Sequence, residues 1–389
     1  MEKLKIGIIC FSSYGGSGAL ATELGKRLAK KGHKIHFISS AIPFRLVGPW
    51  QRNIYYHQPY QIDYPLFTDR TLDQVIFINK IIELAKSEKI DLFHAHYILP
   101  FGIDIAIAKE ILKSQGIKTK IITTFHGTDI SKFADDPSIS EVIKYSIKKN
   151  DALTAVCRAT STQAKEHFNL SKTPRVIYNF VEIKREPEAK NLELRSIFAS
   201  NNEKIIIHIS NFREVKRLQD VITIFHNVNK KIPTKLLLVG DGPEQKTAQK
   251  YAAKYKLINK IHFMGFQSYV EKLLSIADLF LLPSETEAFS LSALESMACR
   301  VPVAASAIGG MTEMIDDGVE GLLSPVGDIK SMSEKIINLL SDEAKYKKMS
   351  MNAYQKVAKK FNAELICQQY EKLYFEVLRR KNISRRSNA

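Results

Sequence analysis

The sequence has no apolar run long enough to span a bilayer, and its first residues lead directly into a predicted strand instead of a signal peptide. Cysteine is scarce: the four cysteines are widely separated and show no C-x-x-C spacing. This pattern indicates neither a disulfide framework nor a zinc site and is typical of buried free thiols. We therefore expect a cytoplasmic protein.

Long basic runs interleaved with aromatic residues are also absent, although lysine and arginine number 57 against 41 acidic residues, a net charge of +16. Such an excess is compatible with nucleic acid, an anionic membrane surface or anionic small substrates as partners. Because the positive charge is spread thinly in short pairs, we interpret most of it as solvated surface. We expect no nucleic-acid partner, and membrane association is an alternative that the pattern does not favour.

The chain of 389 residues is long enough for two domains, each with its own core. Predicted strands and helices alternate throughout, which indicates an α/β protein built from two doubly wound sheets. The predicted strands are 4–10, 34–39, 90–97, 120–129 with its turn, 152–156, 175–181, 204–210, 235–239, 261–264 and 279–282. Residues 183–199, which are charged and contain a proline, form the expected linker.

Residues 283–327 carry the pattern with the most chemistry. A buried strand ends just before them, and Glu287 lies in the loop that follows. Ser290 is a favourable N-cap for a helix from Leu291, whose amides and dipole favour a phosphate. Glu295 lies one turn into that helix, so two carboxylates eight residues apart suit the hydroxyls of a nucleotide-sugar. Two solvated glutamates on an exposed helix face are the alternative.

Two segments of the amino half follow predicted strands and can bind anions. The first strand runs into a glycine-rich loop before a helix from Ala19, an arrangement that lets backbone amides approach a phosphate. Its spacing is neither G-x-G-x-x-G nor a P-loop, so a tight turn without a ligand is equally compatible. Arg45 follows the second strand and can hold a carboxylate with two parallel hydrogen bonds, or lie on the surface without a partner.

Histidines and basic residues mark the ends of three further strands. His94 and His96 stand at i and i+2 on one strand and so face the same way, but no third zinc ligand with suitable spacing is evident. His126 lies just past the next strand, over the carboxyl edge of the sheet, where it can bond a sugar hydroxyl. Arg213 and Lys216 directly follow strand 204–210, where positive charge can neutralise a diphosphate.

The motifs in chain order resemble the family 4 retaining glycosyltransferases, which have the GT-B fold. In the carboxyl half the resemblance is carried by Glu287 and Glu295, a Val-Pro-Val strand, Gly309-Gly310 and the segment 312–321. In the amino half the matching motifs are Pro-Phe-Arg-Leu at 43–46, Asp-Leu-Phe-His-Ala-His-Tyr ending at Tyr97, Thr-Thr-Phe-His-Gly-Thr-Asp containing Thr128, and Tyr-Asn-Phe-Val containing Asn179.

The resemblance implies two Rossmann-like domains facing across a cleft. Residues 1–183 would form the acceptor-side domain and residues 184–362 the nucleotide-sugar domain, with a last helix at about 363–389 packing back on the first domain. The motifs of the amino half are similar to those of family members that glycosylate L-malate in the first step of bacillithiol biosynthesis. They imply UDP-N-acetylglucosamine as donor and L-malate as acceptor.

The same resemblance implies roles for individual residues. Lys216, with Arg213, would neutralise the diphosphate, Glu295 would bind the uridine ribose, Glu287 the 3-hydroxyl of the sugar and His126 its 6-hydroxyl. Arg45 would bind a malate carboxylate. Family members retain the anomeric configuration without a protein nucleophile, and neither a metal nor another cofactor is implied. The implied binding residues are completed by Gly15, Gly16, Ser17, Gly18, Tyr97, Thr128, Asn179, Phe289, Ser290 and Leu291.

The chain departs from the family pattern at two positions, where Ser290 and Arg300 replace the usual glycines. These departures and the positive charge favour an alternative, a family 4 enzyme with a lipid or polysaccharide acceptor at the membrane surface. A binding protein that has lost transfer activity is a further alternative, against which Glu287, Lys216 and His126 argue. The oligomeric state stays open, a homo-oligomer included.

Overall fold

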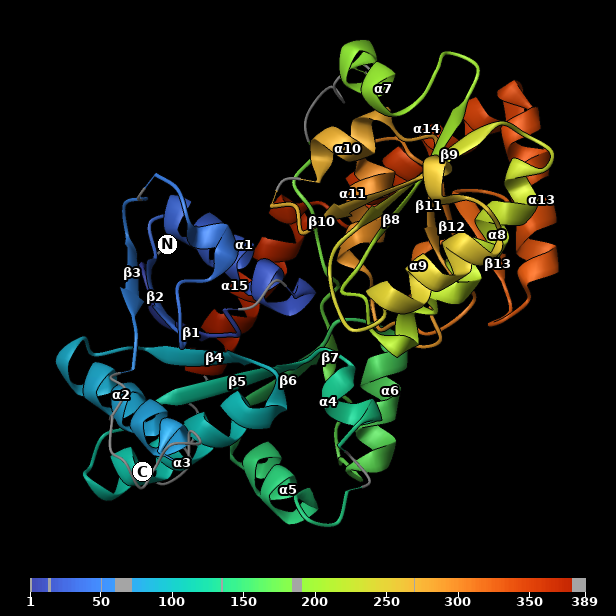
Figure 1. Ribbon diagram of the computed structural model, residues 1–389. Helices are drawn as coiled ribbons and strands as arrows, with labels where there is room; N and C mark the ends of the chain where they lie inside the picture. The colour runs from blue at the N-terminus through green and yellow to red at the C-terminus, as the bar shows by residue number, and fades with distance from the viewer. Residues whose placement is uncertain are drawn as a thin grey trace. The chain divides into compact units, whose positions relative to one another are not determined.

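The computed structural model describes residues 2–12, 15–49, 51–59, 72–133, 136–183, 191–268 and 270–379. The chain forms two compact units. Unit 1 comprises Met1–Tyr178 and Glu364–Ala389, and unit 2 comprises Asn179–Ala363. Each unit is built on one parallel sheet with helices on both faces, so the predicted fold class of two doubly wound α/β domains is confirmed (Figure 1).

Unit 1 contains a sheet of seven described strands in the order β3-β2-β1-β4-β5-β6-β7. Neighbouring strands pair in parallel, and the chain order reverses between β1 and β4. Ligands of open α/β sheets bind outside the carboxyl ends of the strands at such a switch point. The strands are β1 (Lys5–Ile9), β2 (Lys34–Ile38), β3 (Ile54–His57), β4 (Leu92–His96), β5 (Lys120–Phe125), β6 (Ala152–Ala155) and β7 (Arg175–Val176).

The helices of unit 1 cover both faces of this sheet because its strands are almost continuous apolar runs that need burial on two sides. Figure 1 shows α2, α3 and α5 on one face and α1 and α15 on the other. The helical segments are α1 (Gly16–Lys30), η1 (Phe44–Leu46), α2 (Asp73–Ser87), η2 (Ile98–Gly102), α3 (Ile103–Ser114), α4 (Thr128–Ser131), α5 (Ser140–Lys149), α6 (Arg158–His167) and α15 (Ala363–Arg379).

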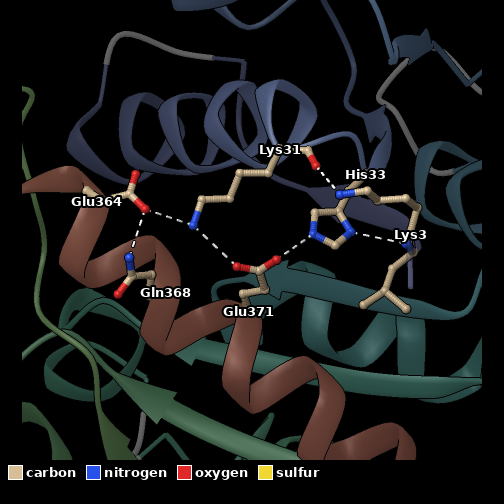
Figure 2. A network of polar contacts seen from close by, with 7 residues as sticks. Lys3, Lys31, His33, Glu364, Gln368 and Glu371 are labelled. Carbon is tan, nitrogen blue, oxygen red and sulfur yellow. Dashed lines mark hydrogen bonds and ion pairs between the residues drawn. The ribbon is translucent and has the colours of Figure 1, made fainter. Parts of the chain in front are cut away.

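The last helix, α15, is joined to the rest of unit 1 by a partly buried polar network (Figure 2). The backbone amide of Leu4 donates to Nδ1 of His33 at 3.0 Å, so the ring proton sits on Nε2 and is donated to Glu371 at 2.9 Å. Lys31 adds ion pairs to Glu371 at 3.3 Å and to Glu364 at 3.0 Å. Because the imidazole is 1% exposed, removing either partner would leave a buried polar group unpaired.

Unit 2 contains a sheet of six described strands in the order β10-β9-β8-β11-β12-β13, and its switch point lies between β8 and β11. Helices α8 and α13 pack together, as do α11 and α14. The strands are β8 (Lys204–Ile209), β9 (Thr234–Val239), β10 (Ile261–Gly265), β11 (Leu279–Leu282), β12 (Val303–Ser306) and β13 (Gly321–Ser324). The helical segments are α7 (Leu192–Phe198), η3 (Glu214–Lys216), α8 (Leu218–Asn229), α9 (Gln245–Lys254), η4 (Ile258–Lys260), α10 (Glu271–Ile276), α11 (Leu291–Ala298), α12 (Met311–Met314), α13 (Ile329–Ser341) and α14 (Glu343–Lys360).

Several elements differ from the sequence-based expectations. The expected strand 175–181 is a strand only over β7, followed by an isolated parallel bridge between Val181 and Asn362, and β3, α6 and α14 were not predicted. Helix α6 is short and polar, and α14 is rich in lysine, so neither shows a clear apolar stripe. The expected linker contains helix α7, which Asn191 caps by accepting the amide of Leu194 at 2.9 Å. Residues 184–190 of that linker lie outside the described residues.

Candidate active site

In unit 2, the two motifs predicted to bind a nucleotide-sugar meet at the switch point. Strand β8 leads into η3, which carries Lys216, and β11 leads into the loop that carries Glu287. Nζ of Lys216 donates to Oε2 of Glu287 at 2.6 Å, although the residues are 71 positions apart in the sequence. The side chains are 13% and 14% exposed, so a partly buried ion pair stands at the edge where the fold binds ligands.

The backbone around Glu287 is held by close packing against a pair of glycines. A Cβ atom on Gly309 would lie 2.1 Å from the carbonyl oxygen of Glu287, and one on Gly310 would lie 2.0 Å from that of Ala288. The amide of Gly310 donates to the carbonyl of Ala288 at 2.7 Å. The Glu287 loop is therefore fixed by contacts that only glycine allows.

Ser290 caps helix α11 beside this loop. Its hydroxyl accepts the amide of Ala293 at 3.2 Å and lies 3.1 Å from the hydroxyl of Ser292. The first two amides of the helix, those of Leu291 and Ser292, precede any carbonyl that the helix can offer them. The serine that replaces the usual glycine thus engages the third amide, and the first two stay available to an anion at the positive end of the dipole.

The other predicted residues of unit 2 surround the same helix start. Asn179 donates to the carbonyl of Phe289 at 2.8 Å, and the ring of Phe289 packs edge-on against Phe361 at 5.3 Å. Glu295 is 8% exposed on the first turns of α11. Arg213 is exposed, and its carbonyl accepts the amide of Lys216 at 2.9 Å.

Arg300 ends α11 in the left-handed region, with φ of 60°. Its amide donates to Met297 at 3.1 Å and the amide of Val301 to Ser296 at 3.0 Å, which is the Schellman pattern. The guanidinium lies 5.1 Å from the ring centre of Tyr354, a cation–π contact that partly offsets the strain of a non-glycine residue here.

In unit 1, aromatic contacts connect the ends of β1, β4 and β5. Tyr97 follows β4 with φ of 93°, and its ring stacks on His126 at 5.0 Å and meets Phe11 edge-on at 5.4 Å. The hydroxyls of Ser12 and Ser40 lie 3.3 Å apart, which joins the segments after β1 and β2. Residues from four strand ends therefore gather at the carboxyl edge of this sheet.

The glycine-rich segment and Arg45 lie at neighbouring parts of that edge. Helix α1 begins at Gly16, three residues before the expected start, so Gly16, Ser17 and Gly18 form its first turn and Gly15 is the N-cap. Their amides are therefore helix N-terminal donors and not loop amides. Arg45 lies in η1 over the ring of Phe44, and Lys26 of α1 donates to its carbonyl at 3.0 Å.

His94, His96 and His126 form one buried cluster in unit 1. Nδ1 of His96 lies 3.1 Å from Nε2 of His126, and His94 bonds Tyr374 at 2.8 Å and Thr124 at 2.7 Å. Burial, and for His94 also the neighbouring His126, lowers the pKa of His94 and of His126 to about 3, so His126 is a neutral hydrogen-bonding group. Among the residues that the structure describes, no three His, Cys, Asp or Glu side chains are grouped to hold a metal ion.

Asp129, which the sequence analysis did not single out, organises the turn that carries His126 and Thr128. Its carboxylate accepts the amides of Gly127 at 2.8 Å, His126 at 3.1 Å and Ile98 at 3.3 Å. Burial raises the pKa of Asp129 to about 6, against the opposing effect of these amides. Gly-Thr-Asp directly after a strand is the signal, because an aspartate that bonds nearby amides is typical of such turns. Thr128 is the first residue of α4.

Within the described ranges, no helix combines the length and the apolar character needed to cross a bilayer.

The predicted site residues fall into two groups, one at the carboxyl edge of each sheet.

Comparisons with known proteins agree with this arrangement. Residues 14–185 match the profile of Glycosyltransferase Family 4, and residues 190–356 match that of Glycosyl transferases group 1. The chain is 40% identical over 378 residues to the N-acetyl-alpha-D-glucosaminyl L-malate synthase of Bacillus anthracis, covering 97% of this chain and 98% of that protein. An uncharacterized glycosyltransferase of Methanocaldococcus jannaschii is 28% identical over 76% of this chain and 78% of its own.

Solved structures show the same fold at lower identity. Sucrose-phosphate synthase from Thermosynechococcus elongatus matches 96% of this chain and 99% of its own with a TM-score of 0.79 at 20% identity. Anabaena HepE in complex with UDP matches 96% and 100% with a TM-score of 0.78 at 21% identity. From the fold and the relationship to the Bacillus protein over nearly the whole of both chains, this protein belongs to the family 4 glycosyltransferases and has their GT-B fold.

Proposed function

We propose that the protein transfers N-acetylglucosamine from UDP-N-acetylglucosamine to the hydroxyl of L-malate with retention of the anomeric configuration, the first step of bacillithiol biosynthesis. The observation that carries the proposal is the 40% identity over 97% of the chain to the L-malate synthase of Bacillus anthracis. The ion pair at the switch point of unit 2 supports the proposal, because its lysine is a cation that would neutralise a diphosphate.

On the donor side, the reaction builds negative charge on the departing diphosphate. Lys216 and Arg213 supply positive charge from the loop after β8, and the amides of Leu291 and Ser292 add the dipole end of α11. The ion pair with Glu287 holds Lys216 in place before the reaction, and the backbone of α11 holds its amides, which is the condition for strong electrostatic stabilisation. Glu287 would accept a hydrogen bond from the 3-hydroxyl of the sugar, and Glu295 from the ribose of uridine.

On the acceptor side, the hydroxyl oxygen of L-malate forms the bond to the anomeric carbon as the bond from that carbon to the diphosphate oxygen breaks. The leaving diphosphate takes the hydroxyl proton, so no protein nucleophile is needed. His126 would bond the 6-hydroxyl as a neutral imidazole, because burial keeps its pKa at about 3. Arg45 would pair with a malate carboxylate, and neither a metal nor another cofactor enters the step.

A second candidate function is transfer to a lipid or polysaccharide acceptor at the membrane surface. The net charge of +16 favours it, since a basic protein is attracted to anionic headgroups. The same catalytic residues would serve, and only the acceptor would differ.

The two candidates are separated by an acceptor screen. The protein is incubated with UDP-N-acetylglucosamine and a panel of hydroxy acids, and UDP release and product masses are measured. We expect L-malate to raise UDP release far above background hydrolysis and to give a glycosylated malate. No rise with L-malate would reject the proposal, and release that needs anionic vesicles, with flotation of the protein on them, would establish the second candidate.

Replacing Arg45 by leucine is expected to raise the KM for L-malate on the order of 10- to 100-fold, the loss of a charge-assisted hydrogen-bonded pair. The KM for the donor should stay within about 2-fold, because the proposed donor contacts lie elsewhere in the sequence. Arg52→Leu, at an exposed arginine of the same unit, is the matched control. An equal rise in both KM values for Arg45→Leu would remove Arg45 from the acceptor site.

A further inference from the structure

Strands β8 and β11 separate at the switch point of unit 2. Their register covers only the pairs Leu279↔Ile206 and Phe280↔Ile207. Beyond these pairs, β8 continues along β9 as far as Ile209, and β11 continues along β12 as far as Leu282. The carboxyl-terminal ends of β8 and β11, which lead to Lys216 and Glu287, are therefore not joined to each other by ladder hydrogen bonds.

The side chain of His208 stands at the point where this ladder stops. It is 0% exposed, its Nδ1 lies 2.8 Å from the carbonyl oxygen of Leu281, and its Nε2 lies 2.7 Å from Oγ of Ser210. A carbonyl oxygen only accepts, so Nδ1 carries the proton and Nε2 accepts the hydroxyl proton of Ser210. One imidazole thus links β11 to the first residue after β8 with both of its nitrogens satisfied.

We propose that His208 is a positioning residue for the diphosphate site, and this proposal rests on the proposed function. The imidazole takes the place of the missing ladder bonds and sets the spacing between the loops of Lys216 and Glu287.

Three observations support this assignment. Burial lowers the pKa of His208 to about 4; the hydrogen bond to Leu281 raises this pKa, and the charge of Lys216 lowers it further. The ring therefore stays neutral and keeps its single tautomer near neutral pH. The two loops are joined above the imidazole by the amide of Glu285, which donates to the carbonyl of Val215 at 2.8 Å. The Lys216 loop is also fixed from below, since a Cβ on Gly240 would lie 1.8 Å from the carbonyl oxygen of Ser210.

The position of Ser210 therefore depends on three contacts: its amide donates to the carbonyl of Val239 at 3.1 Å, Gly240 packs against its carbonyl, and the imidazole binds its hydroxyl. Helix α11 joins the same arrangement, because the hydroxyl of Ser292 donates to the carbonyl of Ile209 at 3.2 Å. A change at His208 would shift the Lys216 loop against the start of α11, the two groups proposed to contact the diphosphate. Catalytic groups displaced by about 1 Å lose on the order of 10²-fold in rate.

The test is a graded series of variants with UDP binding as the readout. His208→Asn keeps a donor near the Leu281 carbonyl but loses the acceptor for the Ser210 hydroxyl. Ser210→Ala removes that hydroxyl and so loses the same hydrogen bond. His208→Leu loses the bonds to both Leu281 and Ser210. We expect the Kd for UDP to rise about 3- to 10-fold for the first two variants. For His208→Leu we expect a rise on the order of 10- to 100-fold, with the KM for L-malate unchanged.

His226→Asn is the matched control, since His226 lies on α8 and stacks on Tyr255 at 4.3 Å. A purely structural role predicts lower melting temperatures with an unchanged Kd for UDP in the folded fraction, and this result would overturn the proposal. If His208→Leu does not fold, His208→Asn and Ser210→Ala test the proposal instead. A wild-type affinity for UDP in both of these variants would overturn the proposal. Calorimetry with UDP needs no acceptor, so a failure of L-malate as acceptor leaves this test intact, whereas wild-type protein that binds no UDP refutes the proposed function itself.

Discussion

Replacing Lys216 by methionine is expected to lower kcat on the order of 10²- to 10³-fold, the cost of removing one preorganised group that stabilises developing charge. Lys216 is 13% exposed, so water does not replace the lost charge efficiently. The variant should also bind UDP more weakly, because the diphosphate loses a cation in the ground state as well. Steady-state kinetics with UDP-N-acetylglucosamine and calorimetry with UDP measure the two effects.

Replacing Glu287, the partner of Lys216, tests the same ion pair, but here we expect the affinity for UDP not to fall. Glu287→Gln removes the negative charge 2.6 Å from Lys216, so UDP should bind as tightly as to wild type or more tightly, while kcat falls strongly. Lys335→Met is the matched control, because Lys335 forms an ion pair of similar length with Asp317, at 2.7 Å, on the more exposed helix α13. If Lys216→Met keeps kcat within about 3-fold of wild type, the electrostatic role of the pair is rejected.

Acidification from pH 7 to pH 5 is expected to unfold unit 1 before unit 2. Burial lowers the pKa of His94 and of His126 to about 3 and that of His36 to about 4, and it lowers the pKa of His96 as well. Because each folded pKa lies below the unfolded value of about 6.5, the unfolded chain binds more protons between them, and stability present at pH 7 is lost as the pH falls. At pH 5 His36, His94 and His126 each remove about 2 kcal/mol from the free energy of unfolding, and His96 acts in the same direction.

Two buried aspartates of unit 1 act in the opposite direction. Burial raises the pKa of Asp104 to about 7 and that of Asp129 to about 6, so the folded state takes up protons there and gains about 3–4 kcal/mol over the same interval. A net loss of about 2–3 kcal/mol remains from the three histidines with these pKa values, and His96 adds to it, against the 5–15 kcal/mol that stabilises a typical domain. In unit 2 the largest shift is that of His208, whose pKa burial lowers to about 4, and the pKa values of the less buried His226 and His262 are lowered as well.

Differential scanning calorimetry at pH 7, 6 and 5 measures this difference. Two transitions should separate as the pH falls, the lower one belonging to unit 1. His36→Gln removes one titrating ring and should make the lower transition less dependent on pH. A single transition with the same midpoint at pH 7 and pH 5 would contradict the expectation.

The sequence was sufficient for the fold class and for most of the candidate site because parallel strands end at one edge. Lys216 and Glu287 each follow an apolar run, and this pattern alone predicts that both lie at the carboxyl edge of a sheet. Their direct contact depends on loop packing against Gly309 and Gly310, which no periodic pattern encodes. The roles of the site residues remain predictions that the proposed variants test.

Buried polar residues were the hardest part to predict. His208 stands inside an apolar strand and Asp129 inside a turn, so both are compatible with an ordinary core or loop. Their importance depends on partners that are distant in sequence, such as the Leu281 carbonyl for His208. Strand β3 was missed for a different reason, since its residues Ile54–His57 are short, partly exposed and only weakly alternating.

Helix α15 makes unit 1 discontinuous along the chain, whereas unit 2 is one continuous segment. During synthesis on the ribosome, Asn179–Ala363 leaves the exit tunnel complete and can fold while the first unit still lacks its final helix. Until then the nascent chain has no carboxylate of Glu371 for His33 and no phenol of Tyr374 for His94. The amino-terminal unit is thus completed only after the second unit has been synthesised.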